Sequence, residues 1–437
     1  MNLEELNSIR TQLTEFINVF KTSLGRSERV HWCKLYVSGL ILDGERKSIE
    51  PMAERLPGGN EQALQQFVNQ SPWDYAAIQQ KLAHHLAKNM NIKKGVLVLD
   101  DTSLPKKGES SVGVSRQYCG ALGKIANCQS IVTWHYSEIE QEHFPIIGEL
   151  FLPQSWTRYK KRMKAAKVPE GRFKFLKKWE IALQLLNKIS KKDFPYEALA
   201  FDAGYGEVRE FLGELDKRKL TFVAQIPESH SFWPLDVSLN YENNFKGRPR
   251  KYPEITNKKF KPLSAKKWLE KLVRENTKWE KVKLNLKSKE YSEVFAIRVK
   301  ETISQAFYRP GPDRWLIIEK FGNGQYKYYV SNAPEKSSIE QIVLWAHERW
   351  KIEQGYQQLK EELGLDHFEG RSWLGLHHHI TLCFMAFGFL TLLKHRAKGK
   401  KNLDHSSSSK EITKQVIPSN NLPLLQKSSR FLRKDFF

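Results

Sequence analysis

One segment near the C-terminal end, AHERWKIEQGYQQLKEELGLDHFEGR (Ala346–Arg371), constrains the fold more than any other. Helical spacing places four polar side chains within a sector of roughly 60°. These are Arg349, Glu353, Tyr356 and Lys360. An apolar stripe lies beside them, formed by Trp345, Ile352, Leu359 and Leu363. The pattern predicts a helix that packs on a core and presents a carboxylate flanked by cations. A surface helix with i,i+4 salt links would show the same pattern.

Two apolar runs upstream each end in an acid. Val96–Leu99 precedes Asp100, and Leu199–Phe201 precedes Asp202. Each run reads as a buried strand with its acid at the carboxyl end. Acids at such positions commonly end strands or cap helices, which is the simpler interpretation of either one alone. Together with Glu353, however, three carboxylates from separate elements can share two divalent cations roughly 4 Å apart.

The order of the expected elements fits an α/β, RNase H-like fold with a mixed-sheet catalytic core. In that fold the first acid lies on the first strand, the second on the fourth strand and the third on a late helix. The remaining core elements are expected as strands at Ser130–Tyr136, Pro145–Leu152 and Thr221–Ile226, and as helices at Phe173–Ser190 and Glu207–Arg218.

On these residues the chain resembles the DDE transposases of bacterial insertion sequences, in the branch with the signature Tyr-x2-Arg-x3-Glu-x6-Lys. Three landmarks are present, at Arg349, Glu353 and Lys360. The tyrosine position holds Ala346, so Trp345 or Trp350 would have to take over that role. DDTSLPKKG, DAGYG and GLDHFEGRSWLGLHHHITL also resemble one subgroup, and the resemblance covers roughly residues 30–395.

The resemblance implies that Asp100, Asp202 and Glu353 are catalytic and hold two Mg²⁺ ions, with Mn²⁺ able to substitute. The family pattern Asp-x-Ser/Thr aligns Asp100 as the ligand, and Asp101 is the competing choice. Arg349 and Lys360, with Tyr356 on the same face, would lie near DNA phosphates. The implied reaction cuts the ends of an insertion sequence and joins each 3′-hydroxyl to target DNA, within a synaptic homodimer.

The charge of the chain agrees with a double-stranded DNA partner. Lys and Arg number 71 against 49 acids, which gives a net charge of +22 and a pI near 9.6. The excess is uneven, since Arg158–Lys178 contains ten basic residues and one acid. A cationic protein could instead bind membranes or acidic partners. Basic clusters flanking the acids favour nucleic acid, because carboxylates alone would repel phosphates.

Residues 1–90 are expected to form an all-α, DNA-binding domain. Arg46–Asp74 reads as helix, Pro-Gly-Gly turn and helix, which fits a DNA-binding helix-turn-helix and equally an ordinary helical hairpin. Arg46 and Lys47 are the candidate DNA contacts there.

The catalytic core is expected at 91–228 and again at 336–395, with a β-rich insertion at 229–335 and a basic flexible tail at 396–437. A loop at 245–253 of the insertion contains Lys246, Arg248, Arg250 and Lys251. A basic loop without base preference is favoured over an Arg hook for an A·T-rich minor groove.

Several features predict a cytoplasmic protein with no membrane partner. The four cysteines form no CxxC pair, and the N-terminus is polar rather than a signal peptide. Ile380–Leu393 is too short to span a bilayer and fits a buried helix. His377–His379 suggests a metal cluster, but adjacent histidines on a helix point in different directions.

Two other function classes fit much of the same sequence. A DNA-binding repressor or domesticated derivative would keep the fold and lose catalysis, which the intact acids argue against. A simple RNase H-like nuclease would cleave DNA without joining it. Joining to a target, measured separately from cleavage, distinguishes these classes.

Overall fold

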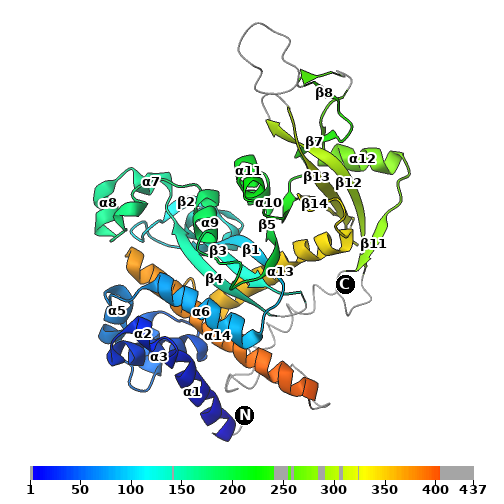
Figure 1. Ribbon diagram of the computed structural model, residues 1–437. Coiled ribbons are helices and arrows are strands. Elements are labelled where there is room, and N and C mark those ends of the chain that lie inside the picture. Colours follow the sequence, from blue (N-terminus) through cyan, green and yellow to red (C-terminus); the bar gives the residue numbers. More distant parts are fainter. Residues whose placement is uncertain are drawn as a thin grey trace.

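The computed structural model describes residues 3–139, 142–240, 254–256, 260–283, 291–304, 309–322 and 324–403. Its N-terminal part is helical, as expected (Figure 1). The six helices are α1 (Leu3–Asn18), α2 (Lys21–Leu24), α3 (Ser27–Ile41), α4 (Ile49–Arg55), α5 (Glu61–Asn69) and α6 (Tyr75–Met90). The Pro-Gly-Gly turn falls between α4 and α5, where Gly58 has a φ of +77° that favours glycine. Asp74 caps α6 by accepting the Ala76 N–H at 2.8 Å.

A five-stranded core sheet has the spatial order β4-β3-β1-β5-β6. Its strands are β1 (Gly95–Pro105), β3 (Lys124–Ser137), β4 (His143–Phe151), β5 (Tyr196–Phe201) and β6 (Phe222–Ile226). β3 runs antiparallel to β1 and β4, whereas β5 is parallel to β1 and β6. β1 and β5 are buried almost throughout, as apolar runs in the middle of a sheet require. β2 (Ser115–Cys119) forms a hairpin with the first part of β3.

Helices cover both faces of this sheet. α9 (Lys178–Leu186) packs on β3 and β4, and α13 (Ile339–Glu361) crosses β1, β5 and β6. The indole N–H of Trp134 in β3 donates to the Ala182 carbonyl of α9 at 2.9 Å. On the other face, Ile352 and Leu359 of α13 are fully buried. The predicted apolar stripe is therefore the face by which α13 packs on the sheet. The helix begins earlier than the 346–371 segment and ends at Glu361, before Gly364 with its φ of +65°.

The described part of the interval before α13 is largely β, and its strands continue the core sheet except for β8 and β9, which form a separate two-stranded sheet. β14 (Tyr326–Ser331) pairs antiparallel with β6, and β13 (Arg309–Lys320), β12 (Tyr291–Ser304), β7 (Ser231–Pro234) and β10 (Leu263–Ser264) follow. β11 (Glu280–Lys283) pairs with β12, and β8 (Leu239–Asn240) with β9 (Glu254–Ile255). α12 (Ala265–Arg274) packs against this layer, and Figure 1 shows the described strands of this extension at the upper right.

A buried charged group ties this extension to the core. Arg314 of β13 donates to Glu301 of β12 at 2.9 Å and to Asp216 at 3.0 Å. Asp216 belongs to α11 (Arg209–Lys217), which follows β5 along the core. Arg314 and Glu301 are both almost completely buried. Burial by itself would lower the pKa of Arg314. The hydrogen bond and charge of Asp216, together with Glu301, raise this pKa instead. These bonds fix the extension relative to α11.

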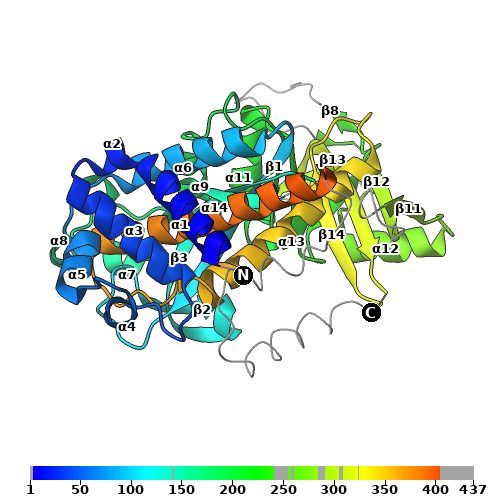
Figure 2. The same cartoon turned by 90° about the horizontal axis from the view of Figure 1, so that it is seen from below.

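The last helix, α14 (Trp373–Leu403), packs against α3, α5, α6 and β4, and both Figure 1 and Figure 2 show it beside α6. Its segment Trp373–Lys398 is long and apolar enough to cross a membrane, but 89% of its most apolar window is buried inside the protein. The three consecutive histidines point to different partners. His377 contacts the Trp373 carbonyl at 2.8 Å, His378 the Val68 carbonyl at 2.8 Å, and His379 the Tyr36 hydroxyl at 2.9 Å.

Candidate active site

Asp100 and Asp101 lie inside β1, not at its end as predicted, because the strand continues to Pro105. Successive side chains of a strand point to opposite faces of the sheet. Asp100 faces α13, and only 8% of its surface is exposed. Asp101 faces α9, where Lys178 bonds its carboxylate at 2.6 Å and the Ser130 hydroxyl donates to it at 2.9 Å. The two candidate ligands therefore have different neighbours, and Asp101 is already neutralised.

Asp202 directly follows β5 and lies next to Asp100, which is on the adjacent strand β1. The parallel register pairs Leu99 with Phe201, so the two acids are the next residues on adjacent strands. Neighbouring strands lie about 4.8 Å apart, which brings the two carboxylates close. Asp202 also caps the short helix α10 (Ala203–Gly206), since its carboxylate accepts the Tyr205 N–H at 3.2 Å.

Gly206 is the second glycine of the DAGYG motif, and its packing explains why a glycine is needed there. A Cβ at this position would lie 2.0 Å from the Gln225 carbonyl oxygen of β6, far inside contact distance. Only glycine therefore allows α10 to sit this close to the sheet. That close packing fixes the chain that carries Asp202.

Arg349 joins the third acid to the first two. Its Nη2 atom lies 2.7 Å from Glu353 Oε1, one turn along α13, and its Nη1 atom lies 3.8 Å from Asp100 Oδ2. Asp202 also interacts with it electrostatically. Burial by itself would lower the pKa of Arg349, but the charges of the three acids raise it. The guanidinium therefore stays charged among three carboxylates. Glu353 is 47% exposed, so this end of the site opens to solvent.

The two aspartates do not ionise as ordinary surface carboxyls do. Burial, followed by the charge of Asp202, raises the pKa of Asp100 to about 8, and Arg349 only partly offsets this. Burial, followed by the charge of Asp101, also raises the pKa of Asp202. Two carboxylates that share a poorly solvated site disfavour each other's charge. The site therefore has an excess of negative charge that one guanidinium does not cancel.

Tyr356 and Lys360 lie further along α13. Tyr356 is buried, and its hydroxyl hydrogen-bonds Thr133, the β3 residue paired with Asp100. Lys360 is half-buried, which lowers its pKa, while the nearby Asp366 and Asp100 act in the opposite direction. Tyr356 thus supports the strand pair beneath Asp100, and Lys360 remains a cation close to the acids. As contacts to DNA, both stay predictions.

The other predicted DNA contacts lie in different environments. Arg46 forms an exposed salt bridge with Glu369, whereas Lys47 is buried and its ammonium donates to the Leu42 carbonyl. Burial lowers the pKa of Lys47 to about 8. The basic loop with Lys246, Arg248, Arg250 and Lys251 lies outside the described residues. All of these remain predictions as DNA contacts, although burial sets Lys47 apart from a surface cation.

Two further residues beside the acids, Lys178 and Tyr205, were not predicted from the sequence. Lys178 is the last residue of the basic run 158–178, and Tyr205 belongs to DAGYG, so both had a signal nearby. Tyr205 is buried and its hydroxyl donates to Asp101 at 3.4 Å. Of the two tryptophans beside Ala346, Trp345 is buried and Trp350 is 56% exposed.

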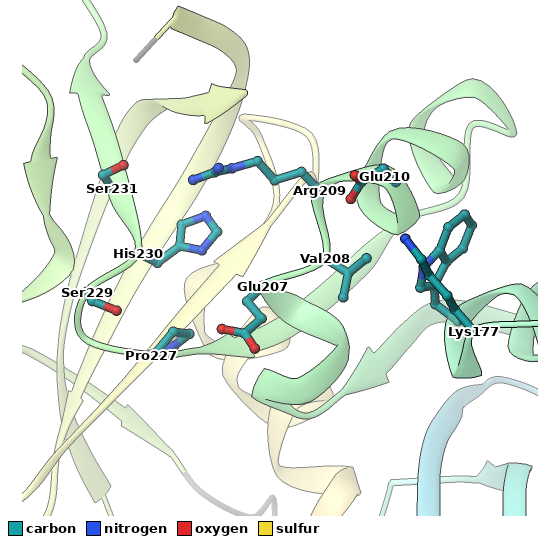
Figure 3. Close-up of a pocket in the computed structure, with 10 residues that line it drawn as sticks. Lys177, Glu207, Val208, Arg209, Glu210, Pro227, Ser229, His230 and Ser231 are labelled. Carbon is teal, nitrogen blue, oxygen red and sulfur yellow. The ribbon is translucent and has the colours of Figure 1, made fainter. Parts of the chain in front are cut away.

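A cavity of about 520 Å³ adjoins α10 where the core meets the β extension. Its walls come from the start of α9, the segment between α10 and α11, and the chain entering β7. In Figure 3, the Arg209 side chain extends above His230, Glu207 lies below, and Lys177 lies at the far end. The cavity is therefore near Asp202 along the chain but has its own lining.

The three predicted acids are not gathered into a preformed metal site. Among the described residues, no group of three or more histidine, cysteine or carboxylate side chains is placed to hold a metal ion. Arg349 lies between the acids instead, bonded to Glu353 and close to Asp100.

Comparison with known proteins places the chain in a family. The family described as DDE superfamily endonuclease matches residues 19–290, a range that contains Asp100 and Asp202 and stops before α13. A probable transposase for insertion sequence element IS701 from Microchaete diplosiphon is 29% identical over 193 residues, which is 44% of this chain. The match spans 47% of that relative, about half of its length.

Among solved structures, the chain is similar to a cryo-EM structure of the piggyBac transposase synaptic complex with hairpin DNA. The match covers 95% of this chain and 84% of that one, at 11% identity and a TM-score of 0.37. A likeness this low does not define a shared fold. The family match, by contrast, covers well over half of the sequence. The chain therefore belongs to the DDE superfamily of endonucleases.

Proposed function

We propose that this protein is a DNA transposase that cuts the ends of an insertion sequence and joins the resulting 3′-hydroxyl to target DNA. The observation that carries the proposal is the adjacent register of Asp100 and Asp202, with Glu353 linked to them through Arg349. Membership of an endonuclease family supports DNA cleavage, and similarity to an insertion-sequence transposase supports the joining step.

The core sheet supports an RNase H-like assignment. Three strands in the order β4-β3-β1 are antiparallel, and β5 and β6 extend the sheet in parallel with β1. We assign 91–228 and 336–395 to this core, 1–90 to a DNA-binding domain, 229–335 to the insertion and 396–437 to a basic tail. The order of the acids along the chain fits the same assignment. Asp100 lies on β1, Asp202 follows β5, which is the fourth core strand in chain order, and Glu353 lies on the late helix α13.

The chemistry of the three acids suits a divalent cation such as Mg²⁺ or Mn²⁺. Carboxylate oxygens are the ligands these ions prefer. Burial and the charge of Asp202 raise the pKa of Asp100, and a bound cation would offset both effects. Asp100, Asp202 and Glu353 would be the ligands. Cations held there would make an attacking oxygen more nucleophilic and stabilise the leaving oxygen.

The protein's own cations have separate roles in this proposal. Arg349 partly neutralises the acids in the free protein and can turn to a phosphate oxygen once another cation satisfies the carboxylates. A guanidinium binds phosphate through two parallel N–H bonds, so it can also hold the scissile group in place. Lys360 adds a second positive charge where the transition state gains negative charge. No side chain forms a covalent bond to DNA in this scheme.

Double-stranded DNA is the proposed partner, both as element ends and as target, and two chains would pair the two ends. The proposed location is the cytoplasm. Neither alternative class has a specific structural observation in its favour. A repressor would bind ends without cutting them, and a simple nuclease would cut them without joining.

The test uses the purified full chain and a duplex that carries the DNA flanking its own gene. With Mg²⁺ or Mn²⁺, we expect nicking at the element end and, in a separate assay, joining of that end to a plasmid. Asp202→Asn and Glu353→Gln should abolish both reactions and leave binding to the duplex largely intact, because affinity comes mainly from cations. Glu361→Gln changes an exposed acid two turns further along α13 and serves as the matched control. Cleavage by Asp202→Asn at the wild-type rate would refute the proposed site.

A further inference from the structure

The segment 158–178 has an unusual charge for its length, with ten basic residues and only Glu170 as an acid. It connects β4 to α9 and includes α8 (Lys160–Ala165), after the short α7 (Gln154–Thr157). Its buried side chains Met163, Val168 and Leu176 anchor it to the core. Both Figure 1 and Figure 2 show α8 at the periphery of the molecule. The segment is thus a fixed part of the fold at the outer surface.

Two of its ten basic residues stabilise the fold. Arg162 stacks on Trp156, with its guanidinium carbon 3.7 Å from the ring centroid, and donates to the Glu109 carbonyl. Arg172 forms a largely buried ion pair with Glu149 at 2.9 Å. These two positions explain how a strongly basic segment packs against the core, and they leave the other eight bases to be explained.

Seven of the remaining bases point to solvent. They are Arg158, Lys160, Lys161, Lys164, Lys167, Lys174 and Lys177. In the part of the chain that the structure describes, no ion pair involves any of them. Exposed lysines of the insertion behave differently, as in the pairs Lys266–Glu228 at 3.3 Å and Lys320–Glu293 at 3.0 Å. The basic segment therefore presents positive charge that no acid among the described residues pairs with.

Two exposed aromatic side chains lie among these bases, Tyr159 at 64% exposure and Phe175 at 40%. Cations interleaved with aromatic rings suit nucleic acid, whose phosphates pair with the cations while sugars and bases pack on the rings. A membrane surface would call for a continuous apolar face beside the cations. The described segment instead buries Met163, Val168 and Leu176 in the core, and its two exposed rings are far apart in sequence.

The C-terminal end of the segment reaches Asp101, on the face of β1 opposite Asp100. Lys178 bonds Asp101 at 2.6 Å, one residue from Asp100, and Lys177 lines the cavity beside α10. Along the chain, the exposed cations therefore run from α8 at the periphery to Lys178, whose charge also acts on Asp202.

We propose that 158–178 is a phosphate track for duplex DNA. Its exposed cations hold the backbone of the duplex next to the cleavage position, and Lys178 exchanges Asp101 for a phosphate oxygen when the strand reaches the acids. This inference rests on the proposed function, since it names a binding surface that leads to the same site.

Binding measured over a series of salt concentrations tests the track. Each phosphate contact contributes about 0.9 to the slope of log K against log salt for duplex DNA. Lys160→Ala/Lys161→Ala/Lys164→Ala should lower that slope by about two to three, with an unchanged melting temperature. The control Lys188→Ala/Lys191→Ala/Lys192→Ala removes the same number of positive charges. These lysines lie before the start of β5, whereas Asp202 follows its end. The control should therefore leave the slope unchanged. Equal effects of the two triple variants, or no effect of the first, would overturn the track.

Lys178 has a separate test, because it could act simply by neutralising Asp101. Lys178→Met should reduce the salt slope by about one and slow cleavage, and Lys178→Arg should keep most of both. Adding Asp101→Asn to Lys178→Met removes the unpaired acid. If Lys178 binds phosphate, the double variant keeps the lower slope. Recovery of the wild-type slope in the double variant would refute the phosphate contact.

These readouts separate the track from the proposed function. A normal slope in the Lys160/Lys161/Lys164 variant of an enzyme that cuts its ends would reject the track and leave the function standing. A reduced slope in a protein that never cuts DNA with any divalent cation would support the track and reject the function. If the wild type bound anionic vesicles or acidic polypeptides as tightly as duplex DNA, the choice of DNA as the partner would be wrong.

Discussion

Replacing Asp100 by asparagine should make the metal-free protein more stable, and increasingly so as the pH rises. Burial, together with the charge of Asp202, holds the pKa of the Asp100 carboxyl at about 8 in the folded protein. In the unfolded chain the same carboxyl ionises near pH 4. Folding at neutral pH therefore requires this group to take up a proton, which costs free energy. Asp100→Asn removes that requirement and keeps the side-chain shape.

The sign and size follow from linkage. Because the folded pKa is raised, the contribution of Asp100 to stability is fully present below about pH 4 and is lost as the pH rises through about 8. Between these limits the wild type loses about 1.4 kcal/mol per pH unit relative to the variant. From about pH 5.5 to about pH 7.5 the difference should grow by roughly 2.7 kcal/mol. For a chain of this length that corresponds to about 3 °C in melting temperature, if it unfolds as one unit.

Thermal melting of the wild type and Asp100→Asn, with a chelator present and at both pH values, measures this difference directly. Asp101→Asn is the matched control, because that carboxylate is already paired with Lys178. It should show no comparable gain at high pH. A difference between wild type and Asp100→Asn that stays constant with pH would show that Asp100 is not held protonated among the acids.

The same variants report on cation binding. Mn²⁺ at about a hundred times its dissociation constant should stabilise the wild type by about 2.7 kcal/mol. Asp100→Asn should lose most of this effect, and Asp101→Asn should keep it. Loss of the effect in Asp101→Asn alone would assign the cation to the other face of β1.

Three further changes test the packing around the site by melting temperature. Gly206→Ala should destabilise the protein and reduce cleavage, because its Cβ would overlap the backbone of β6; an unchanged melting temperature would mean that α10 can move without consequence. Arg314→Leu should cost about 3–5 kcal/mol by removing the cation from two carboxylates that keep only Asn332 and His230 beside them, and a loss below 1 kcal/mol would show that the core and the β extension are not coupled through it. Leu359→Asp should unfold the catalytic region, whereas Lys360→Ala should spare the fold and impair strand processing; equal damage would assign Lys360 a structural role.

Local sequence patterns predicted the elements that carry the acids. The apolar runs before Asp100 and Asp202 became buried neighbouring strands, and the stripe with Ile352 and Leu359 became the packed face of α13. These patterns succeed because burial of apolar side chains dominates the choice of strand or helix face. The β1 boundary was wrong because Asp101 finds Lys178 and Ser130 as partners, which lets the strand continue through two acids.

Contacts between distant parts of the chain could not be predicted from one sequence. Nothing local to β14 indicates that it pairs with β6, some 100 residues earlier, and so extends the core sheet. The burial of Lys47 likewise depends on the chain near Gly364 and His367 packing over it. The position of Arg349 among the acids needs both the register of β1 with β5 and the placement of α13. Each of these depends on tertiary packing rather than on local propensity.

The most direct test of the central claim is a metal switch at each acid. Asp100→Cys, Asp202→Cys and Glu353→Cys place a thiolate, which favours softer ions over Mg²⁺. Each variant should bind the element-end duplex, fail to cleave it with Mg²⁺, and regain measurable cleavage with Mn²⁺ or Cd²⁺. Asp101→Cys should show no such switch. Cleavage by Asp202→Cys with Mg²⁺ at the wild-type rate, or a metal switch at Asp101 in place of Asp100, would contradict the claim that these three acids form one metal-dependent site.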